Sequence, residues 1–213
     1  FSIITYTGTG GAGTIAHGLD SAPTFMIMKN RGVADPWAVY HIGTDASAPA
    51  TKYLVLNTNA AAADDATYWN DTAPTSSVLT VGTNHSVNAD GENYVAYVWA
   101  PVEGGSRFGR FQGNEDDDGT FIYTGFRPKI IFIKENDNAD DWCVYDTARS
   151  TFNPVQKVVR WENAAAEFDN SARAIDILSN GFKIRTSNST INQASTFVYG
   201  AWGDVPFKYN NTF

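Results

Sequence analysis

The sequence is poor in the features on which disulfide-bonded, membrane-spanning and nucleic-acid-binding proteins depend. It has one cysteine, Cys143, in 213 residues, so no disulfide can form within the chain. No apolar run approaches the roughly 18 residues of a membrane-spanning helix, and we expect no insertion into a membrane. Lys and Arg number 15 against 23 Asp and Glu, and they are scattered singly. The net charge is −8, and without a basic cluster we expect no nucleic-acid partner.

Aromatic and turn-forming residues, by contrast, are plentiful. Aromatic residues make up 14% of the chain, a composition that favours strands over helices. Short apolar segments such as YLVLN and NYVAYVW are separated by polar clusters such as NADGEN and LSNG. No segment sustains an apolar period of 3.6 residues. The pattern therefore predicts an all-β chain.

The chain also contains an internal repeat. The segment APTFMIMKN at residues 22–30 is similar to RPKIIFIKE at residues 127–135, and further segments match in the same order. Each copy has about 105 residues and about six or seven predicted strands, which suits a β-sandwich. We therefore predict two tandem β-sandwich-like units, residues 1–107 and 108–213. We expect them to pack together because the junction, EGGSRFGRF, is short.

The first copy contains a glycine pattern that resembles a cofactor-binding loop. Gly8, Gly10 and Gly13 have the G-x-G-x-x-G spacing of a dinucleotide-binding turn. That turn needs a helix directly after it, because the pyrophosphate binds at the N-terminus of the helix. Here TIAHGLDSAP follows, which predicts a strand and a turn. We therefore expect a glycine-rich hairpin turn and no cofactor.

The matching loop of the second copy is acidic. Asn114, Asp116 and Asp118, followed by Gly119, match the first half of a calcium-binding EF-hand loop. The twelfth position of such a loop is a bidentate Glu, whereas this chain has Gly125, so an EF-hand is excluded. Two interpretations are left: a looser calcium site formed by those three side chains, or a solvated turn. The same two interpretations apply to Asp137, Asp140 and Asp141 in NDNADDW.

Two tryptophans stand apart from the repeat. Trp69 and Trp161 have no Trp at the matching position of the other copy, and Trp69 lies in TYWNDT beside Tyr68, Asn70 and Asp71. An exposed ring can stack on the apolar face of a sugar while amide and carboxylate groups bond its hydroxyls. These five residues are therefore candidates for glycan binding. The alternative is that each Trp covers the edge of a sandwich.

We expect no catalytic residues. The sequence lacks the G-x-S-x-G motif that places a serine nucleophile, and its Asp and Glu residues cluster in predicted turns. A polysaccharide depolymerase would need two carboxylates roughly 5–10 Å apart in a cleft. Only Glu162 and Glu167 lie near Trp161 in the sequence.

Several segments together resemble one family of phage proteins. The series YTGTGGAGTIAHGLDSAPTFMIMKNR, WAVYH, APTSSVLTVGTN, NYVAYVWAPVEG, FIYTGFRPKIIFIK, DTARSTFN and LSNGFKIRTS resembles a repeat-built domain in large virion proteins of marine bacteriophages, cyanophages especially. These are usually described as tail-fibre or structural proteins. The resemblance covers nearly the whole chain, and no catalytic or ligand residues come with it. The acidic loop NEDDDG departs from the Gly- and Ser-rich turn that the family leads us to expect.

The resemblance implies a non-enzymatic module of a virion, in a tail fibre or similar appendage, with a host-surface polysaccharide as ligand. It also implies assembly with other virion chains as a homo-oligomer, commonly a trimer in fibres. A purely structural capsid decoration or fibre subunit is the alternative, and a depolymerase is a third. The chain starts at Phe1 within a predicted strand, so we expect a processed product or an excerpt of a longer protein.

Overall fold

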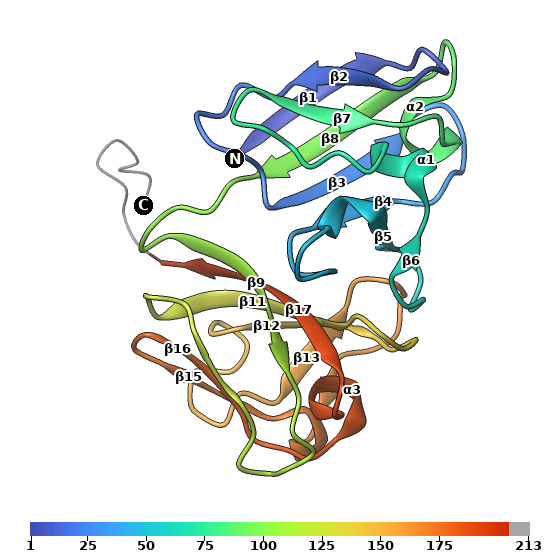
Figure 1. Ribbon diagram of the computed structural model, residues 1–213. Helices are drawn as coiled ribbons and strands as arrows, with labels where there is room; N and C mark the ends of the chain where they lie inside the picture. Colours follow the sequence, from blue (N-terminus) through green and yellow to red (C-terminus); the bar gives the residue numbers. More distant parts are fainter. Residues whose placement is uncertain (205–213) are drawn as a thin grey trace. The chain divides into compact units, whose positions relative to one another are not determined.

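Strands make up nearly all of the regular structure in the computed structural model, which describes residues 1–204 (Figure 1). The chain divides into unit 1, Phe1–Ala100, and unit 2, Pro101–Phe213. The prediction of an all-β chain with two sandwich-like units is confirmed. No helix among the described residues is long and apolar enough to cross a membrane.

Unit 1 contains a six-stranded antiparallel sheet and a two-stranded sheet. The order across the large sheet is β1 (Ser2–Thr7), β8 (Asn93–Trp99), β3 (Phe25–Asn30), β4 (Ala38–His41), β5 (Lys52–Val55) and β6 (Ala63–Asp64). The small sheet pairs β2 (Gly13–Ala16) with β7 (Val78–Val81), and the connections contain η1 (Pro49–Thr51), α1 (Ala66–Trp69) and α2 (His85–Asn88). Alternate residues of β3, Met26 and Met28, share one buried cluster with Leu79 and Val81 of β7. The core of unit 1 therefore lies between its two sheets.

Unit 2 repeats this plan with one more strand. Its large sheet has the order β9 (Ser106–Gln112), β17 (Thr196–Gly203), β11 (Pro128–Glu135), β12 (Trp142–Asp146), β13 (Lys157–Arg160) and β14 (Phe168–Asp169). Its small sheet has the order β10 (Phe121–Tyr123), β16 (Gly181–Ile184) and β15 (Ile175–Leu178), and η2 (Ser171–Arg173) and α3 (Ser189–Asn192) lie in the connections. Ile131 and Ile133 of β11 share a buried cluster with Phe182 and Ile184 of β16.

The two large sheets have the same strand order, so the repeat seen in the sequence is a repeat of the fold. β1, β8, β3, β4, β5 and β6 correspond in turn to β9, β17, β11, β12, β13 and β14. The first strand pair shows the correspondence in detail. Tyr6 stacks on Tyr94 with ring centroids 5.0 Å apart in unit 1, and Phe111 stacks on Phe197 at 5.2 Å in unit 2.

The division between the units comes earlier than the sequence predicted. A boundary after residue 107 would cut β9, yet β9 pairs with β17 along its whole length, from Ser106 to Gln112. A strand belongs to the unit whose sheet it completes, and unit 2 therefore begins at Pro101.

One glycine in each copy is required by a close approach of the backbone. A Cβ atom at Gly8 would lie 2.1 Å from the carbonyl oxygen of Ala89, and one at Gly113 would lie 2.0 Å from that of Gln193. Both distances are far inside van der Waals contact. The loop after the first strand of each unit can pass over the end of α2 or α3 only because no side chain is present there.

Candidate functional site

The glycine loop of unit 1 joins two sheets. β1 belongs to the large sheet and β2 to the small one, so the prediction of a hairpin turn is wrong: the two strands that the loop connects do not pair. The amides of Gly8 and Gly10 donate to the carbonyl oxygens of Glu92 and Asn88, at 2.8 and 2.9 Å. The Thr9 amide donates to Oδ1 of Asn88 at 2.9 Å. These three amides are already hydrogen-bonded, and a strand follows the loop, so the geometry is not that of a phosphate-binding turn.

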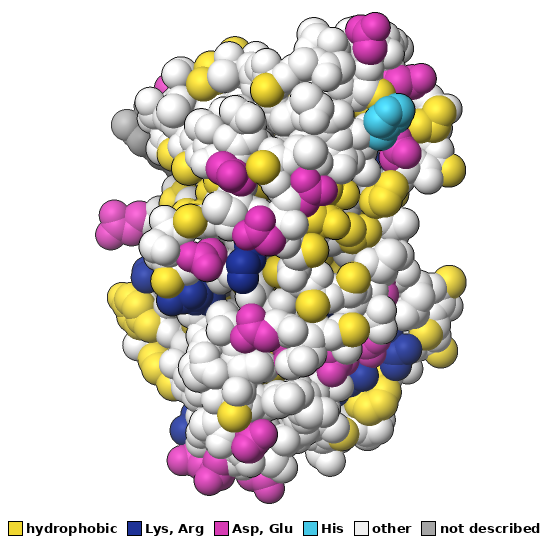
Figure 2. All heavy atoms as spheres, turned by 45° about the vertical axis from the view of Figure 1, so that its right-hand side comes forward, with side chains coloured by type: hydrophobic (Ala, Val, Ile, Leu, Met, Phe, Trp, Pro, Cys, Tyr) yellow, Lys and Arg dark blue, Asp and Glu magenta, His cyan; other side chains and the backbone are white. Residues whose placement is uncertain are grey.

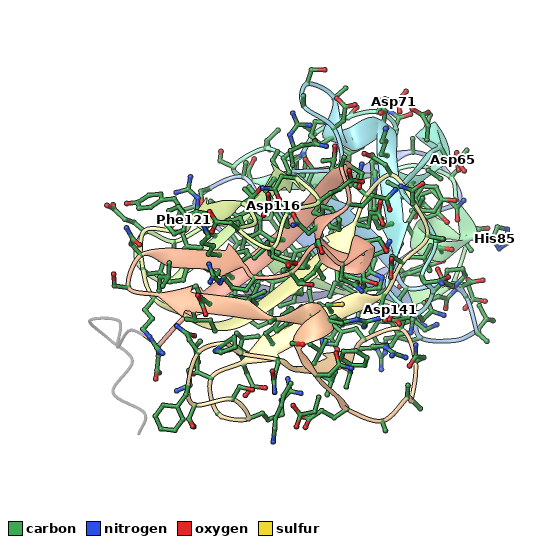
Figure 3. All side chains as sticks on the ribbon, turned by 90° about the horizontal axis from the view of Figure 1, so that it is seen from below. Asp65, Asp71, His85, Asp116, Phe121 and Asp141 are labelled. Atoms are coloured by element: carbon green, nitrogen blue, oxygen red, sulfur yellow. The ribbon has the colours of Figure 1, made fainter. Side chains whose placement is uncertain are left out.

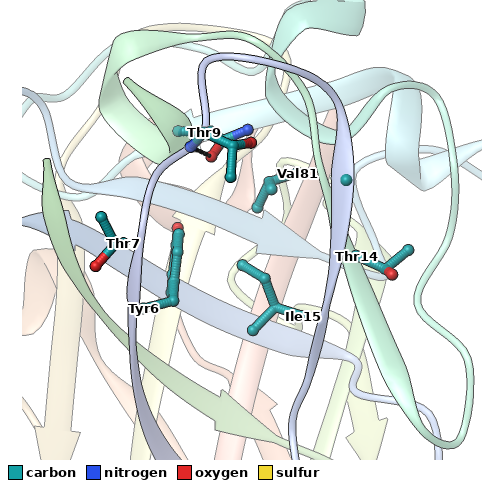
Figure 4. Close-up of a pocket in the computed structure, with 8 residues that line it drawn as sticks. Tyr6, Thr7, Thr9, Thr14, Ile15 and Val81 are labelled. Carbon is teal, nitrogen blue, oxygen red and sulfur yellow. Dashed lines mark hydrogen bonds between the residues drawn. The ribbon is translucent and has the colours of Figure 1, made fainter. Parts of the chain in front are cut away.

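A groove of about 280 Å³ lies beside this loop, between β1 and β2 (Figure 4). Its lining residues are Tyr6, Thr7, Thr9, Gly13, Thr14, Ile15, Val81 and Asn88. The Tyr6 hydroxyl donates to the carbonyl of Val87, and the Asn88 amide nitrogen donates to the carbonyls of Gly11 and Gly82. The Thr7 and Thr9 hydroxyls also donate within the protein, to Oδ1 of Asn93 at 3.2 Å and to the carbonyl of Gly11 at 3.1 Å. Most polar groups of this groove are therefore engaged within the protein.

The candidate calcium ligands of unit 2 hold the acidic loop in shape. Oδ1 of Asn114 accepts hydrogen bonds from the Asp116 amide at 3.2 Å and from the Asn192 side chain at 2.9 Å. Oδ1 of Asp116 accepts from the Asp118 amide at 2.8 Å. The Asp118 carboxylate pairs with Lys183 at 2.8 Å, and the hydrogen bond from this lysine lowers the pKa of Asp118.

Within residues 1–204, no group of three or more His, Cys, Asp or Glu side chains is arranged to hold a metal ion. Oδ1 of each of the three side chains already accepts from a backbone amide, from Asn192 or from Lys183. These bonds favour the solvated turn, fixed to the fold by Asn192, and the looser calcium site stays a prediction.

Trp69 is a core residue, which contradicts its prediction as a sugar-stacking ring. It ends α1, where the Asp65 side chain caps the first turn by accepting from the Thr67 amide at 2.9 Å. Its side chain is 1% exposed, and the indole nitrogen donates to the carbonyl of Lys52 at 3.0 Å. Tyr68 is 5% exposed. The capped helical turn rotates both rings into the space between the sheets, where no sugar can reach them.

The polar neighbours of Trp69 stay on the surface. Asn70 and Asp71 both have left-handed backbone conformations, with φ values of 50° and 48°. Asn70 ends α1 in the way that such residues commonly end helices. Both side chains are exposed, and Asp71 lies near the margin of the view in Figure 3. With Trp69 in the core, these four residues form no joint binding surface.

Trp161 has a different environment, because it lines a groove of about 400 Å³ in unit 2. The groove lies on the side of the large sheet away from the unit 2 core and is lined by Lys129, Ile130, Val144, Asp146, Ala148, Arg149, Val159 and Trp161. Val144 of β12 pairs with Val159 of β13, and Ile130 of β11 pairs with Asp146. The apolar floor therefore spans three adjacent strands whose side chains point to one side.

The Trp161 ring is held by other aromatic rings. Its centroid lies 5.2 Å from that of Phe132 and 6.3 Å from that of Trp142. Its backbone amide donates to the carbonyl of Trp142 at 3.3 Å. Trp161 is partly exposed, whereas Phe132 and Trp142 are fully buried. The ring is therefore fixed in place with part of its surface available to the groove.

Charged groups sit at the rim of this groove. The Arg149 guanidinium pairs with Asp146 and, at 2.9 Å, with Glu167, and it donates to the carbonyl of Val144 at 3.2 Å. Burial alone would raise the pKa of Asp146, but hydrogen bonds from Arg149 outweigh burial and lower it. The pKa of Arg149 is raised, since the two carboxylates outweigh its own burial. Fixed opposite charges thus border an apolar floor.

One pair of carboxyl groups lies close together beside β12 and β13. Asp141 and Glu162 are joined by a side-chain hydrogen bond. Burial raises the pKa of Glu162, while Asp141 pairs with Arg173 at 2.7 Å and with Arg160 at 2.9 Å, and its pKa is lowered. Carboxyls in contact with each other leave no space for the glycosidic bond that glycosidases place between theirs. The cluster is suited to holding β12 and β13 together.

A buried lysine beside this cluster, Lys134, should make the free energy of unfolding depend on pH. Burial lowers the pKa of Lys134 to about 8, from 10.5, despite the nearby Asp140, Glu135 and Glu162. Between these values the unfolded chain binds more protons than the folded one, so stability rises with pH. The contribution of Lys134 to the slope should approach roughly 1.4 kcal/mol per pH unit. The buried Cys143 thiol acts in the opposite direction near and above pH 9, because burial raises its pKa from 9.0 to about 12. Urea unfolding at pH 7.5 to 9.5 should therefore show a steeper rise, or a smaller fall, in the wild type than in a Lys134→Met variant, and equal pH profiles of the two proteins would contradict this.

The sequence predicted Trp161 as a binding residue but did not predict the other residues that line its groove. Ile130, Val144 and Val159 lie on three strands whose register brings them together, and no short motif links them. The turn after β12 did carry a signal. In DTARS, Asp146 accepts hydrogen bonds from the amides of Ala148 and Arg149, which is a typical turn for Asp, and this turn places the arginine at the groove.

Comparison with protein families gives a match over most of the chain. A family model described as Domain of unknown function (DUF7483) matches residues 1–206. Curated proteins and solved structures gave no match. The family match spans both units, so the two-copy arrangement corresponds to one family domain.

Proposed function

We propose that this chain, which belongs to the family described as Domain of unknown function (DUF7483), is a non-enzymatic, glycan-binding module of a bacteriophage virion. The geometry of unit 2 supports this proposal. The observation that carries the proposal is the groove of about 400 Å³ lined by Trp161. Ligand sites of this size are mostly apolar, with a few fixed polar groups that orient the ligand. Ile130, Val144 and Val159 supply the apolar floor, and Arg149 with Asp146 supplies the polar groups.

The chemistry of a sugar suits this groove. One face of a sugar ring carries C–H groups that stack on an indole, and its edge carries hydroxyls that bond charged groups. Arg149 is held by two carboxylates, so it can donate to a ligand without first being ordered. A ligand that brought a full charge would have to displace one of these partners. The groove therefore favours hydroxyl-rich ligands.

The placement in a virion is supported by the resemblance of the sequence to tail-fibre and structural proteins of marine bacteriophages. We propose a location on the tail or capsid surface, in contact with other virion chains, as part of a homo-oligomer such as a trimer. Each shallow groove binds weakly, and several copies on one appendage raise the overall affinity by avidity. The proposed ligand is a polysaccharide of the host surface.

Trp161→Leu tests the groove with the residue that unit 1 has at the matching position. Leu56 is the unit 1 counterpart of Trp161, because its amide donates to the carbonyl of Trp37 as that of Trp161 does to Trp142. We expect the wild-type chain to bind on an array of bacterial surface polysaccharides. Trp161→Leu should weaken binding of the best polysaccharide about tenfold, or 1.4 kcal/mol.

Phe152→Ala is the matched control. Phe152 is 84% exposed and does not line the groove, so its loss should leave binding unchanged. Affinity electrophoresis with the same polysaccharide would compare the three proteins. Equal mobility shifts for the wild type and Trp161→Leu would overturn the groove as the binding site.

A purely structural role is favoured by a different observation. β1 and β9 are matching end strands, but β9 carries exposed Arg107 and Arg110 where β1 has Ser2 and Thr5. Charges on an edge strand discourage pairing with other chains, and β1 has none. The uncharged edge of β1 is suited to a subunit contact. A chain that assembles but binds nothing on the polysaccharide array would support this alternative.

A further inference from the structure

A pair of exposed rings lies on the small sheet of unit 2. Phe121 and Tyr123 are 43% and 55% exposed, and Ile122 between them is buried in the core. The two rings therefore lie on the outer face of β10, at positions i and i+2 of one strand. Their Cα atoms are roughly 7 Å apart along the strand. Phe121 lies toward the margin of the view in Figure 3.

Both rings lie against glycines. A Cβ atom at Gly181 would be 3.0 Å from Cε2 and Cζ of Phe121. A Cβ atom at Gly125 would be 3.6 Å from the hydroxyl oxygen of Tyr123. Each ring thus lies beside a glycine, where a larger residue would place a side chain, and each keeps part of its surface exposed to solvent.

The repeat shows that the fold does not need these rings. In unit 1, Ile15 of β2 pairs with Leu79, as Ile122 of β10 pairs with Phe182. At this register Thr14 and Ala16 occupy the positions of Phe121 and Tyr123, and both are exposed. The same sandwich position is therefore filled by small residues in one unit and by aromatic residues in the other.

Charged side chains surround the two rings and are largely paired with one another. Lys183, directly across from Phe121, binds Asp118 at 2.8 Å, and Arg185 binds Asp118 and Asp176, each at 3.3 Å. The Arg107 guanidinium carbon lies 5.7 Å from the centroid of the Tyr123 ring. Asp and Glu side chains are spread over the face shown in Figure 2, and Lys and Arg are fewer. The border of the two rings therefore carries charges of both signs that pair with one another.

We propose that the outer face of β10 is a second carbohydrate-binding surface, on which a polysaccharide lies along the strand with sugar rings stacked on Phe121 and Tyr123. This inference rests on the proposed function, because it gives the same ligand class a second contact. A protein partner would remove water from Lys183, Arg185 and Asp118, which is costly for charged groups. Sugar hydroxyls replace that water with equivalent hydrogen bonds. The surface thus fits a sugar better than an apolar protein face.

The test replaces both rings by their unit 1 counterparts, Phe121→Thr together with Tyr123→Ala. The probes are cellohexaose, chitohexaose and the best polysaccharide from the array, titrated into the full chain by calorimetry. We expect the double variant to lose one of two binding sites, or about tenfold in affinity for the long polysaccharide. Its urea midpoint should equal that of the wild type, and Phe152→Ala should bind as the wild type does.

The variants separate this inference from the proposed groove. Loss of binding in Trp161→Leu with none in the double variant would overturn the β10 surface and leave the groove. Loss in the double variant with none in Trp161→Leu would support the β10 surface and overturn the groove. If the wild type binds none of the probes, both are overturned.

Discussion

Trp69→Ala is expected to destabilise unit 1 by about 3–5 kcal/mol, the range found for large aromatic residues removed from cores. The ring is 1% exposed, lies 5.9 Å from the Tyr40 ring centroid and donates a hydrogen bond to the carbonyl of Lys52. Alanine would leave a cavity between the sheets and a buried carbonyl without its donor. Urea unfolding followed by far-ultraviolet circular dichroism would measure the loss.

Trp69→Phe is the informative comparison. Phenylalanine keeps most of the apolar contact but has no N–H group, so we expect a smaller loss of about 1–3 kcal/mol. An exposed aromatic residue changed in parallel, Phe152→Ala, should shift stability by less than about 0.5 kcal/mol. A Trp69→Ala chain as stable as Phe152→Ala would show that the ring is on the surface, as the sequence alone suggested.

Gly8→Ala is expected to destabilise unit 1 by about 3 kcal/mol, at the upper end of the usual cost of overpacking, or to prevent it from folding. The added methyl group would lie 2.1 Å from the carbonyl oxygen of Ala89, and backbone at both positions would have to move. Gly113→Ala should have the same effect on unit 2, because the carbonyl of Gln193 would lie 2.0 Å away.

The same loop offers a control. Gly11 lies three residues after Gly8 and has no atom within 4 Å of an added Cβ. Gly11→Ala should therefore change stability by less than about 0.5 kcal/mol. Thermal unfolding of the three variants would compare them. Equal midpoints for Gly8→Ala and Gly11→Ala would show that loop flexibility, and not the close approach, is what this glycine provides.

The repeat could be predicted from the sequence because each strand produces a pattern within a short segment. Alternating apolar residues mark a strand within a few positions, and two copies in the same order mark two units. The sheet orders bear this out, including the pairing of β3 with β8 and of β11 with β17. The place of the boundary was missed, because β9 joins unit 2 through pairing with β17, a strand far along the chain.

The environments of the candidate site residues were harder to predict from the sequence. Asp65 and Asn70 are residues that begin and end a helical turn, and they are the signal that could have placed Trp69 inside. For Trp161 no such local signal exists. Its groove depends on the register of β11, β12 and β13 and on the turn that brings Arg149 to the rim.

The all-β class and the two-copy repeat follow from the sequence alone, since both depend on patterns within or between short segments. The need for glycine at Gly8 and Gly113 and the burial of particular aromatic rings follow from tertiary contacts. Trp69 and Trp161 lie in similarly polar surroundings in the sequence, yet one completes a core and the other lines a groove. The physical reason is that burial depends on which distant strands meet around a side chain, and strand register is a property of the whole sheet.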